Sequence, residues 1–300
     1  MAKKRDIIIG VIIAGSFLVA FAFFGLMLAG LFSAGDGINI AGFGGEVGVI
    51  ELFGVISETT SRPVIKQIDR WASTGSIKAI VLHINSPGGA VAPSQEIYDA
   101  ILRAREKKPV VASMASVAAS GGYYVACAAD RIIANPGTLT GSIGVILQFH
   151  TFEVLMKKVG VETETVKSGD LKDVGSYSRD MTEEESLMLR GVVMDTYEQF
   201  VEAVAEGRSK TKEDIYPLAD GSIFTGLQAY NLGLVDTLGG LHEAIGLAGE
   251  LAGIEGEPTV IRPMERKNID IWDVLGGLAK KLDNTVDEQL SGPQLMFLYK

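Results

Sequence analysis

Two glycine-rich turns, each directly after an apolar strand-like run, constrain this chain more than any other feature. The first is residues 85–89 (Asn-Ser-Pro-Gly-Gly) and the second is residues 118–124 (Ala-Ala-Ser-Gly-Gly-Tyr-Tyr). Ser120 stands among small residues that allow a substrate backbone to approach. The N–H groups of Gly121 and Gly122 open a helix-like run, where the helix dipole favours an oxyanion. Acyl transfer needs such a nucleophile with backbone donors, although Pro-Gly-Gly alone is also ordinary turn chemistry.

Strand-like and helix-like runs alternate around these turns. We expect strands at residues 47–56, 77–84, 109–114, 130–134, 144–147 and 161–166, and helices at residues 61–72, 94–105, 152–159, 181–210 and most of 226–251. This alternation indicates βαβ units with right-handed crossovers. The sequence therefore predicts one α/β domain over residues 47–262.

Four short motifs in the same region resemble a known family. They are residues 85–89, residues 119–124, residues 139–145 (Leu-Thr-Gly-Ser-Ile-Gly-Val), and residues 167–169 (Lys-Ser-Gly) with Lys172 and Asp173. Together they resemble the signal peptide peptidase A family in its short, single-domain form, over about two thirds of the chain. The resemblance implies a ClpP/crotonase-like fold of repeated ββα units. It also implies a membrane-anchored serine protease with a Ser/Lys dyad and no cofactor or metal.

The resemblance assigns roles to five residues. Ser120 matches the nucleophile, and Lys172, 52 positions later, matches the general base. Ser142 matches the serine that hydrogen-bonds the lysine, although a turn or helix cap would also explain a serine there. Gly89 and Gly121 match the backbone donors of the oxyanion hole, where a Cβ would block the approach of the peptide carbonyl.

A serine alone is a weak nucleophile, so Ser120 needs a general base that removes its proton. Lysines and histidines are the candidates for this base. A lysine can serve only if burial lowers the pKa of its ammonium group. Lys172 and Lys167 both follow the expected strand at residues 161–166, and for Lys167 we expect a solvated surface position rather than a role with the substrate. His150, 30 positions after Ser120, is the competitor, because the related ClpP proteases use a histidine downstream of their serine.

Charge and cysteine content exclude several classes of function. The formal net charge is −10 and no basic stripe exists to neutralise phosphates, so nucleic acid is not an expected partner. The single cysteine, Cys127, excludes an internal disulfide and a cysteine-based zinc site, and its apolar neighbours favour a buried thiol. Thr182 and Glu185 form a helix-capping pattern, and we interpret the acids at 183–185 as a solvated face.

The N-terminus predicts the location of the protein. Basic residues at positions 3–5 precede an uncharged apolar stretch, residues 7–32, that would span about 39 Å as a helix. The basic flank favours a cytoplasmic N-terminus, with the catalytic domain outside the cytoplasm. A cleaved signal peptide is the alternative, but the apolar stretch exceeds the usual length. We therefore expect a single-pass anchor in residues 1–33, followed by a flexible linker in residues 34–46.

The C-terminal region, residues 263–300, departs from the pattern of a compact domain. The spacing would place Ile269, Trp272, Leu275, Leu278 and Leu282 on one face of a helix, which could pack on its own domain, on a partner helix or on the membrane. The last apolar stretch, residues 295–299, follows a Ser-Gly-Pro sequence that cannot continue a helix. We expect this tail to occupy or cover a substrate cleft, its own or that of a neighbouring subunit, and to be trimmed by the active enzyme.

The function that fits these features is degradation of apolar peptides, such as signal peptides left in the membrane, by an extracytoplasmic serine endopeptidase. One alternative is a ClpP-like membrane protease of a sister family that cuts a specific membrane partner. Another is a crotonase-like acyl-CoA enzyme or binder, which would use the same glycines without Ser120. CoA thioesters are cytosolic, so an exported domain counts against that alternative. The family resemblance also implies a homo-oligomer with enclosed active sites.

Overall fold

The computed structural model describes residues 46–263 and 296–298 of the 300-residue chain. The chain divides into a unit of residues Met1–Phe43 and a unit of residues Gly44–Lys300, and every described residue belongs to the second. The predicted anchor at residues 7–32 and most of the C-terminal region lie outside the described residues. Within residues 46–263 and 296–298, no helix is long and apolar enough to cross a membrane.

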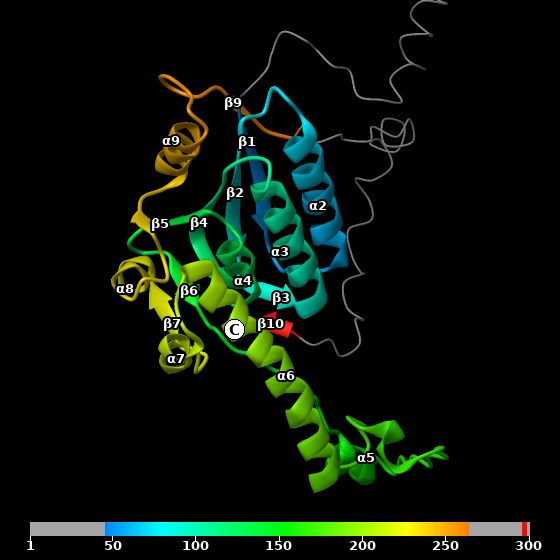
Figure 1. Cartoon of the computed structure of the whole chain (residues 1–300). Helices are drawn as coiled ribbons and strands as arrows, with labels where there is room; N and C mark the ends of the chain where they lie inside the picture. Colours follow the sequence, from blue (N-terminus) through cyan, green and yellow to red (C-terminus); the bar gives the residue numbers. More distant parts are fainter. Residues whose placement is uncertain (1–45, 264–295, 299–300) are drawn as a thin grey trace, which may run out of the picture. The chain divides into compact units, whose positions relative to one another are not determined.

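A mostly parallel sheet forms the centre of the domain (Figure 1). Its strands run in the order β7-β6-β4-β2-β1-β9, and β5 pairs with β4 and with β8. Their bounds are β1 (Val47–Phe53), β2 (Ala79–Ser86), β4 (Val110–Ala119), β5 (Arg131–Ala134), β6 (Leu139–Gly141), β7 (Ile223–Thr225), β8 (Thr237–Leu238) and β9 (Val260–Ile261). A separate two-stranded sheet contains β3 (Gly88–Ala90) and β10 (Met296–Leu298). The parallel pairs confirm the predicted βαβ connections.

Helices cover both faces of the sheet, which explains why its central strands are mostly apolar. One face packs against α2 (Glu58–Ser73), α3 (Val91–Arg105), α4 (Gly121–Cys127) and α6 (Glu183–Arg208). The other face packs against α9 (Leu241–Leu251), on the opposite side of the sheet in Figure 1. The shorter helices are α5 (Glu153–Val159), η2 (Asp170–Asp173), α7 (Lys212–Ile215), η3 (Tyr216–Leu218) and α8 (Gly226–Asn231).

Two strand predictions were wrong. Residues 144–147 form no strand; the nearest one is β6, which ends at Gly141, where the backbone turns with a φ of 77°. Residues 161–166 form no strand either, because they are exposed and lie in a segment that pairs with no neighbouring strand. Strand β4 is longer than predicted and continues through the small residues 115–119, which carries the chain directly to Ser120.

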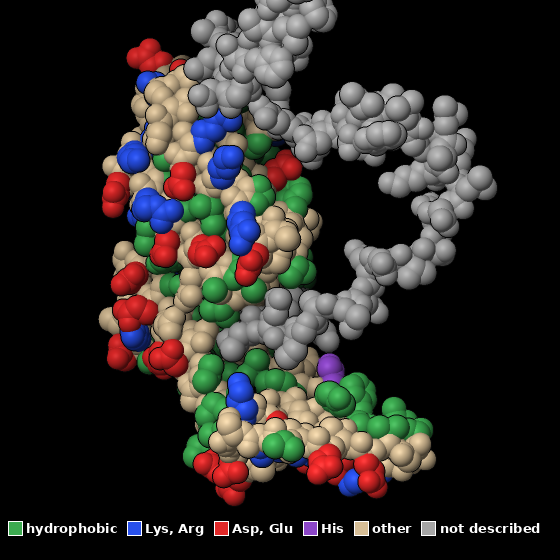
Figure 2. All heavy atoms as spheres, turned by 90° about the vertical axis from the view of Figure 1, so that its right-hand side faces the viewer, with side chains coloured by type: hydrophobic (Ala, Val, Ile, Leu, Met, Phe, Trp, Pro, Cys, Tyr) green, Lys and Arg blue, Asp and Glu red, His purple; other side chains and the backbone are tan. Residues whose placement is uncertain are grey.

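Residues 148–182, which we call the arm, stand away from the sheet between β6 and α6 (Figure 1). Hydrophobic side chains gather on its surface, at the bottom of Figure 2. The exposed ones are Phe152, Val154, Leu155, Val159, Val161, Val166, Tyr177 and Met181. Helix α5 buries none of its residues. A single copy of the chain therefore leaves the apolar surface of the arm exposed to solvent.

Candidate active site

Ser120 occupies a sharp junction between β4 and α4. Its backbone has φ 52° and ψ −118°, a combination that costs energy for any residue other than glycine. Two hydrogen bonds hold this conformation: the Ser120 N–H donates to the Gly141 carbonyl at 2.8 Å, and the Tyr124 N–H donates to the Ser120 carbonyl at 2.8 Å. Helix α4 is buried along its whole length, so the strained serine is fixed by its surroundings.

The two glycine-rich turns meet in space. A Cβ placed on Gly121 would lie 3.3 Å from the Gly88 Cα and 3.3 Å from the Gly89 nitrogen. It would also lie 2.8 Å from the hydroxyl oxygen of Ser94. Glycine at position 121 is therefore required by the close approach of the first turn, which brings the start of α4 against β3.

The N–H of Gly89 points toward the edge of β3 that faces away from Ile56. On the other edge, the Ile56 N–H donates to the Gly88 carbonyl and the Ala90 N–H donates to the Ile56 carbonyl, each at 2.8 Å. Successive residues of a strand direct their N–H groups to opposite sides, so Gly89 directs its donor to the edge that β10 covers in this structure. The geometry thus brings Gly89 and Gly121 together beside Ser120, as the predicted oxyanion hole requires.

Ser142 lies next to Ser120 at the end of the neighbouring strand. Ala119 of β4 pairs with Gly141 of β6, so the two serines follow paired residues. Ser142 has a φ of 51° and its N–H donates to the Ser222 carbonyl at 2.7 Å. The structure therefore brings four of the five predicted site residues to one place.

Two further serines support the first turn and were not assigned a role by sequence reasoning. The Ser86 hydroxyl accepts a hydrogen bond from the Gly88 N–H at 3.1 Å. The Ser94 hydroxyl donates to the Ala90 carbonyl at 2.8 Å, and its oxygen faces Gly121. The Asn-Ser-Pro-Gly-Gly motif could have identified Ser86 as a residue that supports the turn. No sequence motif marks Ser94.

Lys172 is not brought to Ser120. It is exposed and belongs to η2 in the arm, where its backbone N–H donates to the Gly169 carbonyl at 3.1 Å. Within the described part of the chain, no hydrogen bond or ion pair links the Lys172 side chain to Ser120 or Ser142. The burial that a lysine base needs is thus absent in one copy of the chain.

A charge network holds the loop around Lys172. The Arg179 guanidinium donates to both carboxyl oxygens of Asp173, at 3.0 and 2.8 Å, and also binds Glu185. Lys167 donates to Asp173 at 2.7 Å, so it is a structural partner of the arm and not a freely solvated lysine. Arg179 lowers the pKa of Asp173 and that of Glu185, the latter to about 2.

Glu185 forms the predicted helix cap, but its side chain is not solvated as predicted. The capping box with Thr182 is present: the Glu185 N–H donates to the Thr182 hydroxyl at 3.2 Å, and the Thr182 N–H donates to the Glu185 carboxylate at 2.8 Å. The side chain is buried, however, whereas we expected a solvated face at residues 183–185. Its contact with Arg179, which sequence reasoning missed, is the reason.

The remaining candidates are placed away from the serine. His150 is exposed on the arm, and no interaction within the described residues links it to Ser120. Cys127 is fully buried in α4, and burial raises the pKa of its thiol to about 12, as fits the predicted structural thiol. Within the described residues, no cluster of His, Cys, Asp or Glu could hold a metal ion.

The C-terminal tail reaches the site. Strand β10 pairs antiparallel with β3, with Met296 opposite Ala90, Phe297 opposite Gly89 and Leu298 opposite Gly88. It also lies close to the start of α4. The tail thus adds a strand to the edge of β3 toward which the Gly89 N–H points, the way an extended peptide binds a sheet edge. The expectation that the tail occupies a cleft agrees with this pairing.

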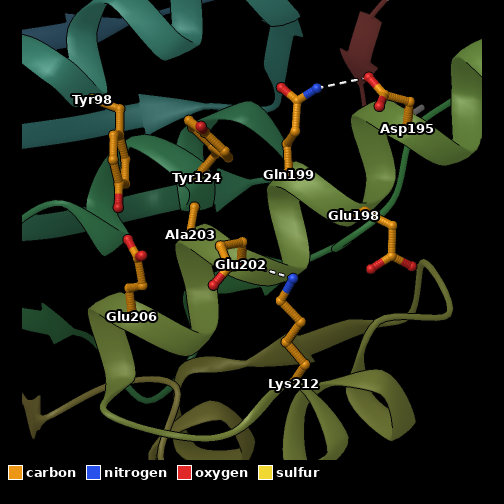
Figure 3. Close-up of a pocket in the computed structure, with 9 residues that line it drawn as sticks. All are labelled: Tyr98, Tyr124, Asp195, Glu198, Gln199, Glu202, Ala203, Glu206 and Lys212. Carbon is orange, nitrogen blue, oxygen red and sulfur yellow. Dashed lines mark hydrogen bonds and ion pairs between the residues drawn. The ribbon is translucent and has the colours of Figure 1, made fainter.

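An acidic cavity of about 400 Å³ lies elsewhere on α6 (Figure 3). Its acids are Asp195, Glu198, Glu202 and Glu206, all from α6. Gln199 donates to Asp195 at 2.8 Å, the Tyr216 hydroxyl donates to Glu198 at 2.8 Å, and Lys212 pairs with Glu202. The first contact lies within α6, and the other two join α6 to η3 and to α7, so we interpret the cavity as structural.

Comparison with known proteins identifies the family. The model of peptidase family S49 matches residues 103–255, and that of Clp protease matches residues 44–138. A putative protease of Synechocystis sp. is 42% identical over 232 residues, which cover 77% of this chain and 83% of that protein. A putative protease of Methanocaldococcus jannaschii is 34% identical over 77% of this chain and 74% of that protein.

The chain belongs to peptidase family S49. The predicted membership of the signal peptide peptidase A family and the predicted serine protease activity are confirmed. The Clp protease match agrees with the predicted ClpP-like α/β domain. Among other S49 relatives, Protease 4 of Salmonella typhi is 36% identical over 73% of this chain but only 38% of its own length. The putative signal peptide peptidase SppA of Enterococcus faecium is 37% identical over 60% of this chain and 53% of its own.

Proposed function

We propose that this S49 peptidase is a membrane-anchored endopeptidase that cleaves apolar peptides with a Ser/Lys dyad. Ser120 is the nucleophile, and the N–H groups of Gly89 and Gly121 stabilise the oxyanion. Lys172 takes the serine proton, and Ser142 orients its amine. The observation that carries the proposal is the strained Ser120 junction packed against the Gly88–Gly89 backbone.

The dyad is completed between two copies of the chain. Ser120 and Ser142 lie in the body of the domain, whereas Lys172 is exposed on an arm that stands away from it. The arm exposes apolar side chains that a single copy leaves in water, among them Val166, which is 96% exposed. Docking the arm on a neighbour would cover these side chains and bury Lys172 beside Ser120, as its role as a base demands.

Apolar peptides are the proposed substrates, bound as an added strand. The tail that pairs with β3 has the sequence Met-Phe-Leu, and its pairing shows how an extended apolar segment can lie against Gly89. Signal peptides are apolar segments that remain in the membrane after secretion. An anchor at residues 7–32, with the catalytic domain outside the cytoplasm, would place the enzyme beside them.

A complementation experiment tests the proposal. Full-length Ser120→Ala and Lys172→Ala should each be inactive on a fluorogenic apolar peptide. Co-expression of the two should restore activity, because one assembled site then combines an intact serine with an intact lysine. His150→Ala is the matched control on the same arm and should stay active.

Other outcomes contradict separate parts of the proposal. Inactive co-expressed variants that form mixed assemblies would show that one chain supplies both groups. A fully active Lys172→Ala together with an inactive His150→Ala would identify the histidine as the base. A purified wild-type enzyme that sediments as a monomer while active would exclude the shared site.

A further inference from the structure

Helix α4, which begins with the Gly121 donor directly after Ser120, is only 7 residues long. So short a helix is not stable by itself, and its direction is set by the groups that hold its two ends. The first end is held at Ser120 by the backbone hydrogen bonds described above. At the other end, the last carbonyl groups lack partners within the helix, and the last turn contains no basic residue. A side chain from another element must therefore hold the far end of α4.

Arg105, in the last turn of α3, provides this side chain. Its Nη1 donates to the carbonyl of Ala128, the residue that caps the end of α4, at 2.9 Å. Its Nε donates to the Asp130 carboxylate at 2.8 Å. The planar guanidinium holds both acceptors in one fixed geometry, which the ammonium group of a lysine does not reproduce. A positive charge at this end of a helix also interacts favourably with the helix dipole.

Asp130 connects the same guanidinium to the start of β4. Its other carboxyl oxygen accepts a hydrogen bond from the Val110 N–H at 2.8 Å, and its own N–H donates to the Val110 carbonyl at 2.8 Å. Val110 is the first residue of β4, and Ala119, the last, precedes Ser120. The strand and the helix that meet at Ser120 are thus joined again at their far ends. We call the pair of Arg105 and Asp130 the clasp.

We propose that the clasp positions the reacting groups of the peptidase by fixing the direction of α4. The inference rests on the proposed function, in which Ser120 is the nucleophile and Gly121 an oxyanion donor. A strained backbone such as that of Ser120 persists only where its surroundings hold it on several sides. If the far end of α4 is released, the helix can tilt, and the serine hydroxyl and the Gly121 N–H move with it. Arg105 and Asp130 therefore act through α4 and do not contact the substrate.

The test separates the catalytic rate from substrate binding and from stability. Full-length wild type and Arg105→Gln cleave one fluorogenic apolar peptide well below their unfolding temperatures, and fluorophosphonate labelling counts the active sites. Arg105→Gln should lower kcat per labelled site on the order of tenfold, with KM changed by less than about twofold, because a misplaced catalytic group costs rate rather than binding. The rate constant of labelling should fall in parallel.

Two further variants of α3 sharpen the test. Arg105→Lys keeps the charge but loses the fork of donors, so its kcat should lie between those of wild type and Arg105→Gln. Arg103→Gln is the matched control, because it removes an ion pair with Asp69 on the same helix in which both side chains are more than half exposed. It should leave kcat and the labelling rate unchanged.

Asp130→Asn keeps the test decisive if Arg105→Gln does not fold. It preserves the size of the side chain but removes its charge, and the side chains of the clasp are 34% and 30% exposed, so water can replace lost contacts. Its kcat should also fall. Wild-type kcat and labelling rate in the clasp variants that fold, even with a lowered melting temperature, would overturn the positioning role and leave the peptidase intact. Failure of the proposed function is separate: it would appear as undiminished cleavage by Ser120→Ala.

Discussion

The body of the domain and the arm are stabilised by different kinds of interaction. At the serine junction, backbone packs on backbone: Gly121 approaches the Gly89 nitrogen, and Ser120 is only 1% exposed. In the arm, the Arg179 network of ion pairs holds a loop whose apolar side chains remain in water. Close packing fixes a strained nucleophile within one chain, whereas the ion pairs around Arg179 shape a loop without covering its apolar side chains. The serine half of the proposed site is thus packed within one chain, whereas Lys172 of the other half is exposed on the arm.

The largest effect expected is at the nucleophile. Ser120→Ala should reduce peptide cleavage to the uncatalysed rate, because it removes the attacking oxygen and nothing else. Thermal unfolding should be nearly unchanged, since the hydrogen bonds at this junction are made by backbone groups. Cleavage clearly above background in the purified variant would remove Ser120 from its role.

Gly89→Ala tests how tightly the body is packed. The added Cβ would lie 2.1 Å from the Ile56 carbonyl oxygen, so β3 must shift and misplace its donor. We expect kcat to fall on the order of 100-fold, the usual loss for one oxyanion donor. Gly75→Ala is the matched control, because nothing lies within 4 Å of its Cβ. Equal activity in both variants would show that β3 has no catalytic part.

Arg179→Gln tests whether the charge network positions the lysine loop. Activity should fall on the order of tenfold, as expected for a misplaced catalytic group, while Arg190→Gln on the exposed side of α6 should have no effect.

The pH profile gives a second readout of the same variant. Arg179 keeps the pKa of Asp173 and of Glu185 low, so in the wild type these contacts persist above about pH 4 and are lost only as pH falls through the lowered values. In Arg179→Gln both pKa values should return toward the ordinary range. The activity of the variant relative to wild type should therefore decline further between pH 7 and about 4.5. A constant ratio would contradict the positioning role.

The smallest effect concerns the tail on β3. Deleting residues 291–300 should raise kcat/KM for a peptide a few-fold, because β10 pairs with the edge on which the substrate is proposed to lie. Intact-mass analysis should find wild type shorter at its C-terminus than Ser120→Ala. Equal masses that include Lys300 would exclude trimming, and unchanged kinetics after the deletion would exclude competition.

Strand prediction succeeded at the centre of the sheet and failed at residues 144–147 and in the arm. Residues 77–84 are mostly apolar because both faces of β2 are buried. A nearly continuous apolar run of this kind can be recognised in the sequence as a buried strand. Residues 161–166 have β-branched character but no neighbouring strand, and strand formation requires a partner. Glu185 was misjudged because its partner, Arg179, lies outside the helix that it caps.

The sequence by itself determined the family, the protease chemistry and the two turns, because these depend on residue types at fixed local spacing. It also placed Gly89, Ser120 and Gly121 in turns that follow predicted strands, and Ser142 in a motif of the family. Only the tertiary structure decided that these four meet while Lys172 lies apart. The packing of β6 beside β4, and the course of the arm away from both, depend on contacts between residues distant in the chain. Such contacts arise from the balance of burial and charge over the whole domain, which no local spacing encodes.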